Sequence, residues 1–224
     1  MQNLLSSISK VLGQFFQVIH SGIAVVIPNP AISYGIAIIV FTIIIRTFLL
    51  PLNIKQMKSQ IKMTEIQPEL KKVQDKYKND PQKANAEVMK LYKEKGVNPL
   101  GGCLPLLVQM PILFALFYVF RDLFTSIHPA PGFLWIPDLS KPDPIKILAL
   151  LSGGTTYISS TLLAAKGDNP QAKQTGTMNI VMAGFLTFMS LNINASLVIY
   201  WIFNNTYQIC QTLVMKRNSK KSLD

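Results

Sequence analysis

The chain has 224 residues, of which 49% are hydrophobic and only 15% are charged, and its formal net charge is +11. Soluble globular domains carry about 25% charged residues, so this composition argues against a soluble protein. The apolar residues fall in long uninterrupted blocks and the mean hydropathy is +0.30, which together indicate an integral membrane protein with a single domain.

Residues 1–28 combine an apolar and a polar face at helical spacing. The pattern predicts an amphipathic helix that lies in the outer interface of the membrane. A cleaved signal peptide is the alternative, but the stretch lacks the basic segment with which such peptides begin. The apolar positions are Leu4, Leu5, Ile8, Val11, Leu12, Phe15, Ile19 and Ile23.

Five segments are long and apolar enough to cross a bilayer, which requires about 20 predominantly apolar residues. We therefore predict an all-α integral membrane protein with five transmembrane helices. Asn192 and Asn194 separate the last two segments, which should form a tight hairpin. The predicted spans are residues 29–52, 99–124, 145–165, 177–193 and 194–215, with an external loop at 125–144 and a cytoplasmic loop at 166–176.

Residues 53–98 are predicted to form a helical hairpin outside the bilayer. Pro68 should kink or interrupt its first arm. Asp80 is placed to cap the second arm with Pro81 at its first position, and Gly96 is placed to end it. A solvated connector is the simpler interpretation, but the segment is far longer than a connection requires. A basic, amphipathic arm beside the bilayer favours contact with partners or lipid headgroups.

Lysine and arginine are distributed unequally between the two sides of the predicted array. Eleven lysines lie between Pro51 and Leu100, and seventeen of the 22 Lys and Arg residues lie on that side, including those of a basic tail at 216–224. The positive-inside rule therefore places the hairpin and the C-terminus in the cytoplasm and the N-terminus outside. Nucleic-acid binding explains the charge less well, although a basic tail could contact ribosomal RNA.

Polar residues inside the spans are the candidates for a functional site. Arg46 is the only charged residue that lies away from the ends of a predicted span, and Thr42 precedes it by one helical turn. Polar residues also recur at three- and four-residue spacing along one side of the last span. This polar stripe includes Asn204, Gln211 and Thr212 in addition to Trp201, Asn205 and Gln208. Such residues usually face a bundle interior or a hydrated cavity. The candidate residues are Arg46, Thr42, Gln109, Trp201, Asn205 and Gln208.

Each of these residues also has a purely structural interpretation. Arg46 lies near the end of its span, so its side chain could extend to the interface. The amides could join neighbouring helices by hydrogen bonds, which is their commoner use in membranes. The pattern alone leaves both interpretations open.

Signals for an enzyme are missing from the sequence. Cys103 and Cys210 fall in spans and supply no disulfide framework, and His20 and His128 lack metal-ligand spacing. Gly101 and Gly102 are not followed by the Lys of a phosphate-binding loop. We therefore expect no enzymatic activity, cofactor or metal, and any work must draw on the membrane potential or on the hydrophobicity of a substrate.

Motifs occur in four parts of the chain: Thr42, Arg46 and 51–52 in the first span, 97–105, 109–112 and 115–118 in the second, 135–140 in the external loop, and 197–201 with Asn205 in the last. They resemble the YidC/Oxa/Alb family of membrane protein insertases, in the same order and over nearly the whole chain. Asn194 and Ser196 depart from the Pro and Gly that usually precede the last motif in this family. The chain looks like a minimal bacterial form, without the large external domain or the lipidated cysteine of other members.

The resemblance implies five core spans around a hydrophilic groove that is closed toward the outside and contains Arg46. It implies an insertase or chaperone in the bacterial plasma membrane that takes up the hydrophilic ends of nascent membrane proteins without hydrolysing nucleotides. We expect the client's apolar segment to leave into lipid along the first and last spans. The implied partners are nascent clients, membrane lipids and, through the hairpin and tail, the ribosome; participation of the Sec translocon and the signal-recognition machinery is left open.

Two other functions remain as alternatives. A membrane-embedded assembly chaperone would bind inserted helices without translocating them. A solute transporter or channel would also carry polar residues in its spans, but it would more often show repeated halves, and the sequence has no internal repeat.

Overall fold

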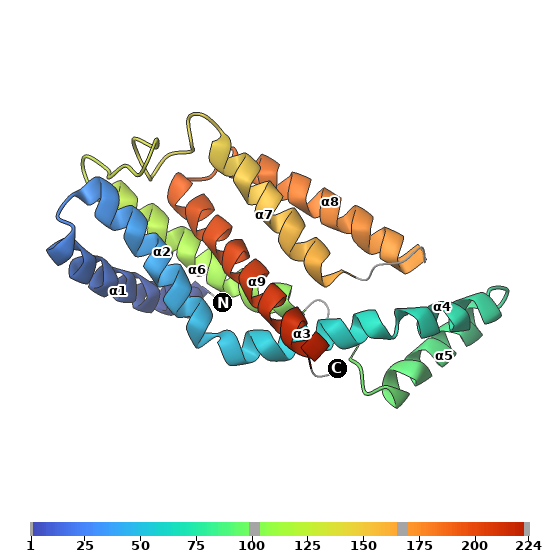
Figure 1. The fold of residues 1–224 in the computed structure, drawn as a ribbon. Helices are drawn as coiled ribbons and strands as arrows, with labels where there is room; N and C mark the ends of the chain where they lie inside the picture. The colour runs from blue at the N-terminus through green and yellow to red at the C-terminus, as the bar shows by residue number, and fades with distance from the viewer. Residues whose placement is uncertain (1, 99–103, 165–169, 222–224) are drawn as a thin grey trace.

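The computed structural model describes residues 2–98, 104–164 and 170–221, so Gly101, Gly102, Cys103 and Lys166 lie outside the described residues. Within these ranges every regular element is a helix, and one isolated β-bridge joins Phe133 to Ile136. The helices are α1 (Gln2–Val26), α2 (Pro30–Phe48), α3 (Leu50–Glu65), α4 (Gln67–Lys76), α5 (Pro81–Glu94), α6 (Leu104–Ser126), α7 (Ile147–Leu163), α8 (Pro170–Ser190) and α9 (Ala195–Lys221) (Figure 1).

Six of these helices form a bundle, and the α4–α5 hairpin projects away from it (Figure 1). In the bundle α7 packs against α8 and α9, α2 packs against α9 and α1, and α1 packs against α6. Each of the five predicted spans falls mainly on one helix, namely α2, α6, α7, α8 or α9, and the end of the first span also includes the start of α3. By length and composition over the described residues, only α2 would cross a membrane unaided; Ile147–Leu162 of α7 is a shorter apolar helix.

The N-terminal helix α1 has a buried face in addition to the two faces expected from its sequence. Phe16 is fully buried and meets the rings of Phe41 and Phe120 edge-on, at centroid distances of 5.7 and 5.5 Å. Val11 and Val18 remain exposed on another side of the helix. Aromatic contacts of this kind stabilise packing beyond simple burial, so α1 is part of the bundle core.

The connection from α2 to the hairpin differs from the predicted one. The chain breaks at Leu49 and continues as α3, whose residues Gln56 and Met57 are buried. Helix α3 contacts α6 and α7, so it lies against the bundle and only α4 and α5 form the projecting hairpin. Pro51 in the first turn of α3 cannot donate to the preceding helix, which accounts for a break at this point.

Local signals determine the ends of the hairpin helices. The Asp80 side chain accepts a hydrogen bond from the Lys83 backbone N–H at 3.1 Å, as expected of an N-cap residue. Gly96 follows the end of α5 with φ of +61°, a conformation that glycine adopts readily. The two arms share a small core formed by Ile66, Leu70, Leu91, Tyr92 and Val97.

The last helix is longer than predicted. Helix α9 continues from Ala195 to Lys221, so Lys216 and Arg217 of the expected basic tail are helical residues. No Pro or Gly interrupts this stretch, and Lys and Arg are good helix formers. The basic end of the chain is therefore a continuation of the helix that carries the polar stripe.

A loop over residues 127–146 covers one end of the bundle. The Asp143 carboxylate is buried and accepts hydrogen bonds from Trp135 Nε1 at 3.1 Å and from the backbone N–H groups of Ile145 and Leu148 at 3.1 and 2.8 Å. The loop also accepts backbone hydrogen bonds from the first residues of α9, at 2.8 Å from Ala195 to Lys141 and at 3.2 Å from Ser196 to Leu139. These contacts attach the loop to α7 and α9.

Candidate functional site

Side chains from six helices line a cavity of about 610 Å³ inside the bundle. This volume is within the range of small-molecule and peptide pockets. Its polar wall comes mainly from α3 and α9, and its apolar wall mainly from α6 and α8. The polar lining residues are Arg46, Asn53, Gln56, Gln60, Gln109, Thr156, Asn204, Asn205, Gln208 and Gln211, together with the rings of Tyr200 and Trp201.

Arg46 lines the cavity and is held by two neutral amides from α9. Its side chain is only 7% exposed, its Nε donates to Asn204 Oδ1, and its Nη2 donates to Gln208 Oε1 at 3.3 Å. The ion pairs of the described residues are Lys95–Glu69, Arg121–Asp122 and Lys141–Asp138, so none involves Arg46. A buried charge is normally paired. Here the positive charge is oriented but not neutralised.

Two other predicted site residues, Trp201 and Asn205, join α9 to α7. Trp201 Nε1 and Asn205 Nδ2 both donate to the hydroxyl of Thr156, at 3.1 and 2.8 Å. Both residues line the cavity, and Asn205 therefore also has the interhelical role that is common for amides in membranes.

The remaining predicted residues lie at different places. Gln109 lines the cavity and donates from Nε2 to the hydroxyl of the buried Tyr200 at 3.2 Å. Thr42 does not line the cavity. It is fully buried and donates to the Ile38 carbonyl of its own helix at 2.6 Å. The structure thus brings together five of the six predicted residues and leaves Thr42 in the packing between helices.

Several cavity residues are absent from the predicted set. Asn204, the principal partner of Arg46, belongs to the polar stripe that the sequence shows, but nothing in the sequence marks it above its neighbours. Asn53, Gln56 and Gln60 lie in the lysine-rich segment, where amides resemble ordinary solvated surface. Their spacing places them on one helical face, but it does not indicate that this face is buried.

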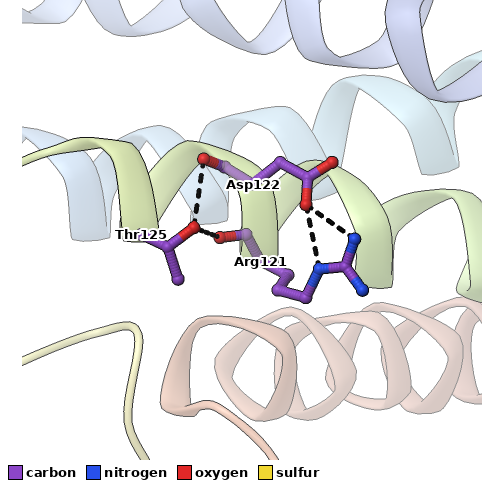
Figure 2. Close-up of polar contacts among 3 residues, drawn as sticks. All are labelled: Arg121, Asp122 and Thr125. Atoms are coloured by element: carbon purple, nitrogen blue, oxygen red, sulfur yellow. Dashed lines mark hydrogen bonds and ion pairs between the residues drawn. The ribbon is translucent and has the colours of Figure 1, made fainter.

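A second cavity of about 590 Å³ lies between α1 and α6. It is lined by Lys10 and Gln14 of α1 and by Asp122 and Ser126 of α6, among others. Asp122 forms an ion pair with the neighbouring Arg121, with 2.9 Å between Arg121 Nη2 and Asp122 Oδ1. Figure 2 shows the two side chains in contact. The Arg121 guanidinium also lies 5.0 Å from the centre of the Tyr118 ring, so its charge is partly satisfied within α6.

Residues 26–222 match the family described as 60Kd inner membrane protein. The chain belongs to this family. A relative from Clostridium tetani named membrane protein insertase YidC is 49% identical over 217 residues, which cover 97% of each chain. A second relative of that name, from Caldanaerobacter subterraneus subsp. tengcongensis, is 40% identical and covers 96% of this chain and 97% of its own.

A solved structure extends this relationship to three dimensions. The crystal structure of an active YidC insertase with its first transmembrane domain resolved aligns with a TM-score of 0.71 and 31% identity. The alignment covers 92% of this chain and 45% of that chain. The resemblance to YidC-type insertases that the motifs indicated is thereby confirmed, as is the helical fold.

Proposed function

We propose that this chain is a membrane protein insertase of the bacterial inner membrane, which takes the polar end of a client into the cavity around Arg46. The observation that carries the proposal is a buried arginine whose side-chain hydrogen bonds, within the described part of the chain, go to neutral amides. It occurs in a chain whose close relatives are named insertases and match it over nearly its whole length.

The proposed topology has five transmembrane helices, α2, α6, α7, α8 and α9, with the N-terminus outside and the C-terminus in the cytoplasm. The lysine-rich α3–α5 segment and the basic end of α9 then lie on the cytoplasmic side. Of the few basic residues on the other side, Arg121 and Lys141 are each paired with a carboxylate, which strengthens the asymmetry of net charge.

Arg46 acts on a client by electrostatic attraction. A carboxylate of the client's polar end about 4 Å from the guanidinium would gain roughly 4 kcal/mol at an effective dielectric constant of 20, before desolvation. A membrane potential that is positive outside adds about 2.3 kcal/mol per negative charge per 100 mV. The burial of the client's apolar segment in lipid completes the reaction, so no nucleotide is consumed.

We propose a release path other than the one expected from sequence. Helices α2 and α9 pack directly against each other, which obstructs exit between the first and last spans. The exposed apolar residues of the cavity wall belong to α6 and α8, with Phe114 48% and Phe185 57% exposed. We therefore place the opening to lipid between α6 and α8, where the client's apolar segment meets surfaces of its own kind.

The remaining partners are proposed on charge. The hairpin and the helical end of α9 present lysines that would attract ribosomal RNA and anionic lipid headgroups. The Sec translocon and the signal-recognition machinery are further candidate partners in delivery of nascent clients.

The test is translocation of the acidic N-terminal tail of a single-span client into proteoliposomes, scored by protection from added protease. Wild type should exceed empty vesicles, Arg46→Lys should retain much of the protection, and Arg46→Ala should remove most of it. Arg121→Ala is the matched control, because it removes an arginine that lies outside this cavity and should leave protection unchanged.

The same assay separates the alternative functions. An assembly chaperone is favoured by the exposed apolar residues of α6 and α8, and it would bind the client's apolar helix without protecting its tail. Wild type no better than empty vesicles would therefore refute the insertase proposal, and client helix binding in those vesicles would then favour the chaperone. A channel would instead give solute flux without any client.

A further inference from the structure

Four amide side chains of the cavity wall bury polar atoms that have no hydrogen-bond partner among the described residues. They are Asn53, Gln56 and Gln60 of α3 and Gln211 of α9. Of the nine such atoms in the described part of the chain, five belong to these four residues. Gln56 is only 6% exposed, and both polar atoms of Gln211 are unpaired. Buried polar atoms are nearly always paired, so this concentration indicates a ligand.

The four amides lie beyond Arg46 on the side of the hairpin. Helix α3 follows the end of α2, and Gln211 lies about one turn past Gln208, which contacts Arg46. A client that enters from the cytoplasmic side in the proposed topology would therefore meet the amides before it reaches the arginine.

The spacing of the amides suits an extended peptide. Residues 53, 56 and 60 share one face of α3 and span about 10 Å along its axis, at roughly 1.5 Å per residue. An extended chain rises about 3.3 Å per residue, so these three amides face about three residues of a bound strand. Gln211 contributes from α9, across the same cavity.

The chemistry of the amides matches a peptide main chain. Every residue except proline offers one N–H donor and one C=O acceptor, and a side-chain amide offers the complementary pair. Amides are neutral, so they do not select for client charge as Arg46 does. Water could also occupy these groups, and the experiment below includes that outcome.

We propose that Asn53, Gln56, Gln60 and Gln211 bind the main chain of the client's polar end, independently of its side chains, on its way to Arg46. The proposal rests on the insertase function and adds the chemical class that the site recognises. It divides recognition between two neighbouring parts of one cavity: the amides bind the backbone, and Arg46 attracts negative side chains.

The probe is a semisynthetic single-span client with a neutral tail, made with an ordinary backbone or with alternate tail amides N-methylated. N-methylation removes the backbone N–H groups that the unpaired Gln60 Oε1 and Gln211 Oε1 atoms would accept, and it leaves the client's side chains unchanged. Wild type in proteoliposomes should insert the methylated tail more slowly, by about fivefold for each hydrogen bond lost. Arg46→Ala should retain this difference. The triple variant Gln56→Leu, Gln60→Leu and Gln211→Leu should insert both tails at one reduced rate.

Two controls keep the outcomes distinct. Asn179→Leu removes another buried unpaired amide that does not line the cavity, and it should behave as wild type. The triple variant should still prefer an acidic tail over a neutral one, which shows that its Arg46 region is intact. Insertion of both tails at equal rates by wild type, or discrimination retained by the triple variant, would mean that the amides bind water only. Wild type no better than empty vesicles with either tail would instead refute the insertase function itself.

Discussion

The buried polar groups at the two ends of the bundle differ in how completely they are hydrogen-bonded. At the end covered by the 127–146 loop, Asp143 accepts three hydrogen bonds and the first backbone N–H groups of α9 are paired with loop carbonyls. At the cavity, Arg46 has only neutral partners and four amides have unpaired atoms. Hydrogen bonds therefore hold one end of the bundle in place, whereas polar groups at the other end remain available to a ligand.

The contrast has exceptions at the loop end. Asn194 Oδ1 and Ser196 Oγ are also buried without a partner. Neither residue lines the cavity. Asn194 directly precedes α9 and Ser196 lies in its first turn, where the backbone N–H groups of Ala195 and Ser196 donate to the carbonyls of Lys141 and Leu139. The groups that hold the loop in place are therefore backbone groups and Asp143. Substitution of Asp143 is the most direct test of this difference between the two ends.

Asp143→Ala should have the largest effect on stability. It removes three hydrogen bonds to a buried carboxylate and leaves their donors unpaired, so we expect a loss of about 3 kcal/mol or more. The free energy of unfolding would be measured by denaturant titration in detergent micelles. Trp135→Phe removes only one of the three donors and should cost about 1 kcal/mol. Equal losses in both variants would contradict the role assigned to Asp143.

Gly35→Ala tests how the loop docks on α2. A Cβ atom at Gly35 would lie 1.9 Å from the ring of Phe133, so the ring must move and the loop with it. Overpacking of this kind typically costs about 1–3 kcal/mol, and we expect about 2. Gly154→Ala is the matched control, since nothing lies within 4 Å of a Cβ there and alanine favours the helix. This prediction is contradicted if both substitutions leave the free energy of unfolding unchanged.

Asn204→Asp tests the cavity, where the positive charge of Arg46 is not neutralised. A carboxylate at this position would pair with Arg46 and compete with acidic client tails. We expect insertion of an acidic tail to fall about tenfold, which corresponds to roughly 1.4 kcal/mol, while a neutral tail is affected less. Protease protection of the two tails would be compared in the same proteoliposomes. An equal decrease for both tails would indicate damage to the fold, not neutralisation of Arg46.

The parts of the fold that depend on local signals could be predicted from the sequence. Asp80 and Pro81 begin α5, and Gly96 follows its end, because capping chemistry is decided within a few residues. Arg46 and the stripe on α9 could also be predicted, because polar side chains in apolar helices are conspicuous. Thr42 lies outside the cavity, and its hydroxyl donates to the Ile38 carbonyl of the same helix, a bond that the sequence pattern does not distinguish from a role in the site.

The amides of α3 could not be predicted to belong to the cavity. Their position depends on the break at Leu49, which turns α3 against α6 and α7. A break of this kind changes the direction of the chain, and its angle is set by packing between distant helices. From sequence alone Gln56 and Gln60 are indistinguishable from the solvated amides of a basic hairpin, whereas in the structure Gln56 is buried and both residues line the cavity.

Glu69→Gln should have the smallest effect. It changes a polar group of the hairpin, which belongs neither to the loop nor to the cavity. Glu69 pairs with Lys95 at 2.7 Å across the hairpin, but both side chains are more than 40% exposed. Exposed ion pairs contribute about 0.2–1 kcal/mol, so we expect a loss near 0.5 kcal/mol that added salt reduces further. Unfolding free energies at low and high ionic strength would measure it. A larger, salt-independent loss would mean that this ion pair organises the hairpin, as Asp143 organises the loop, and that polar groups fix the protein at more than one end.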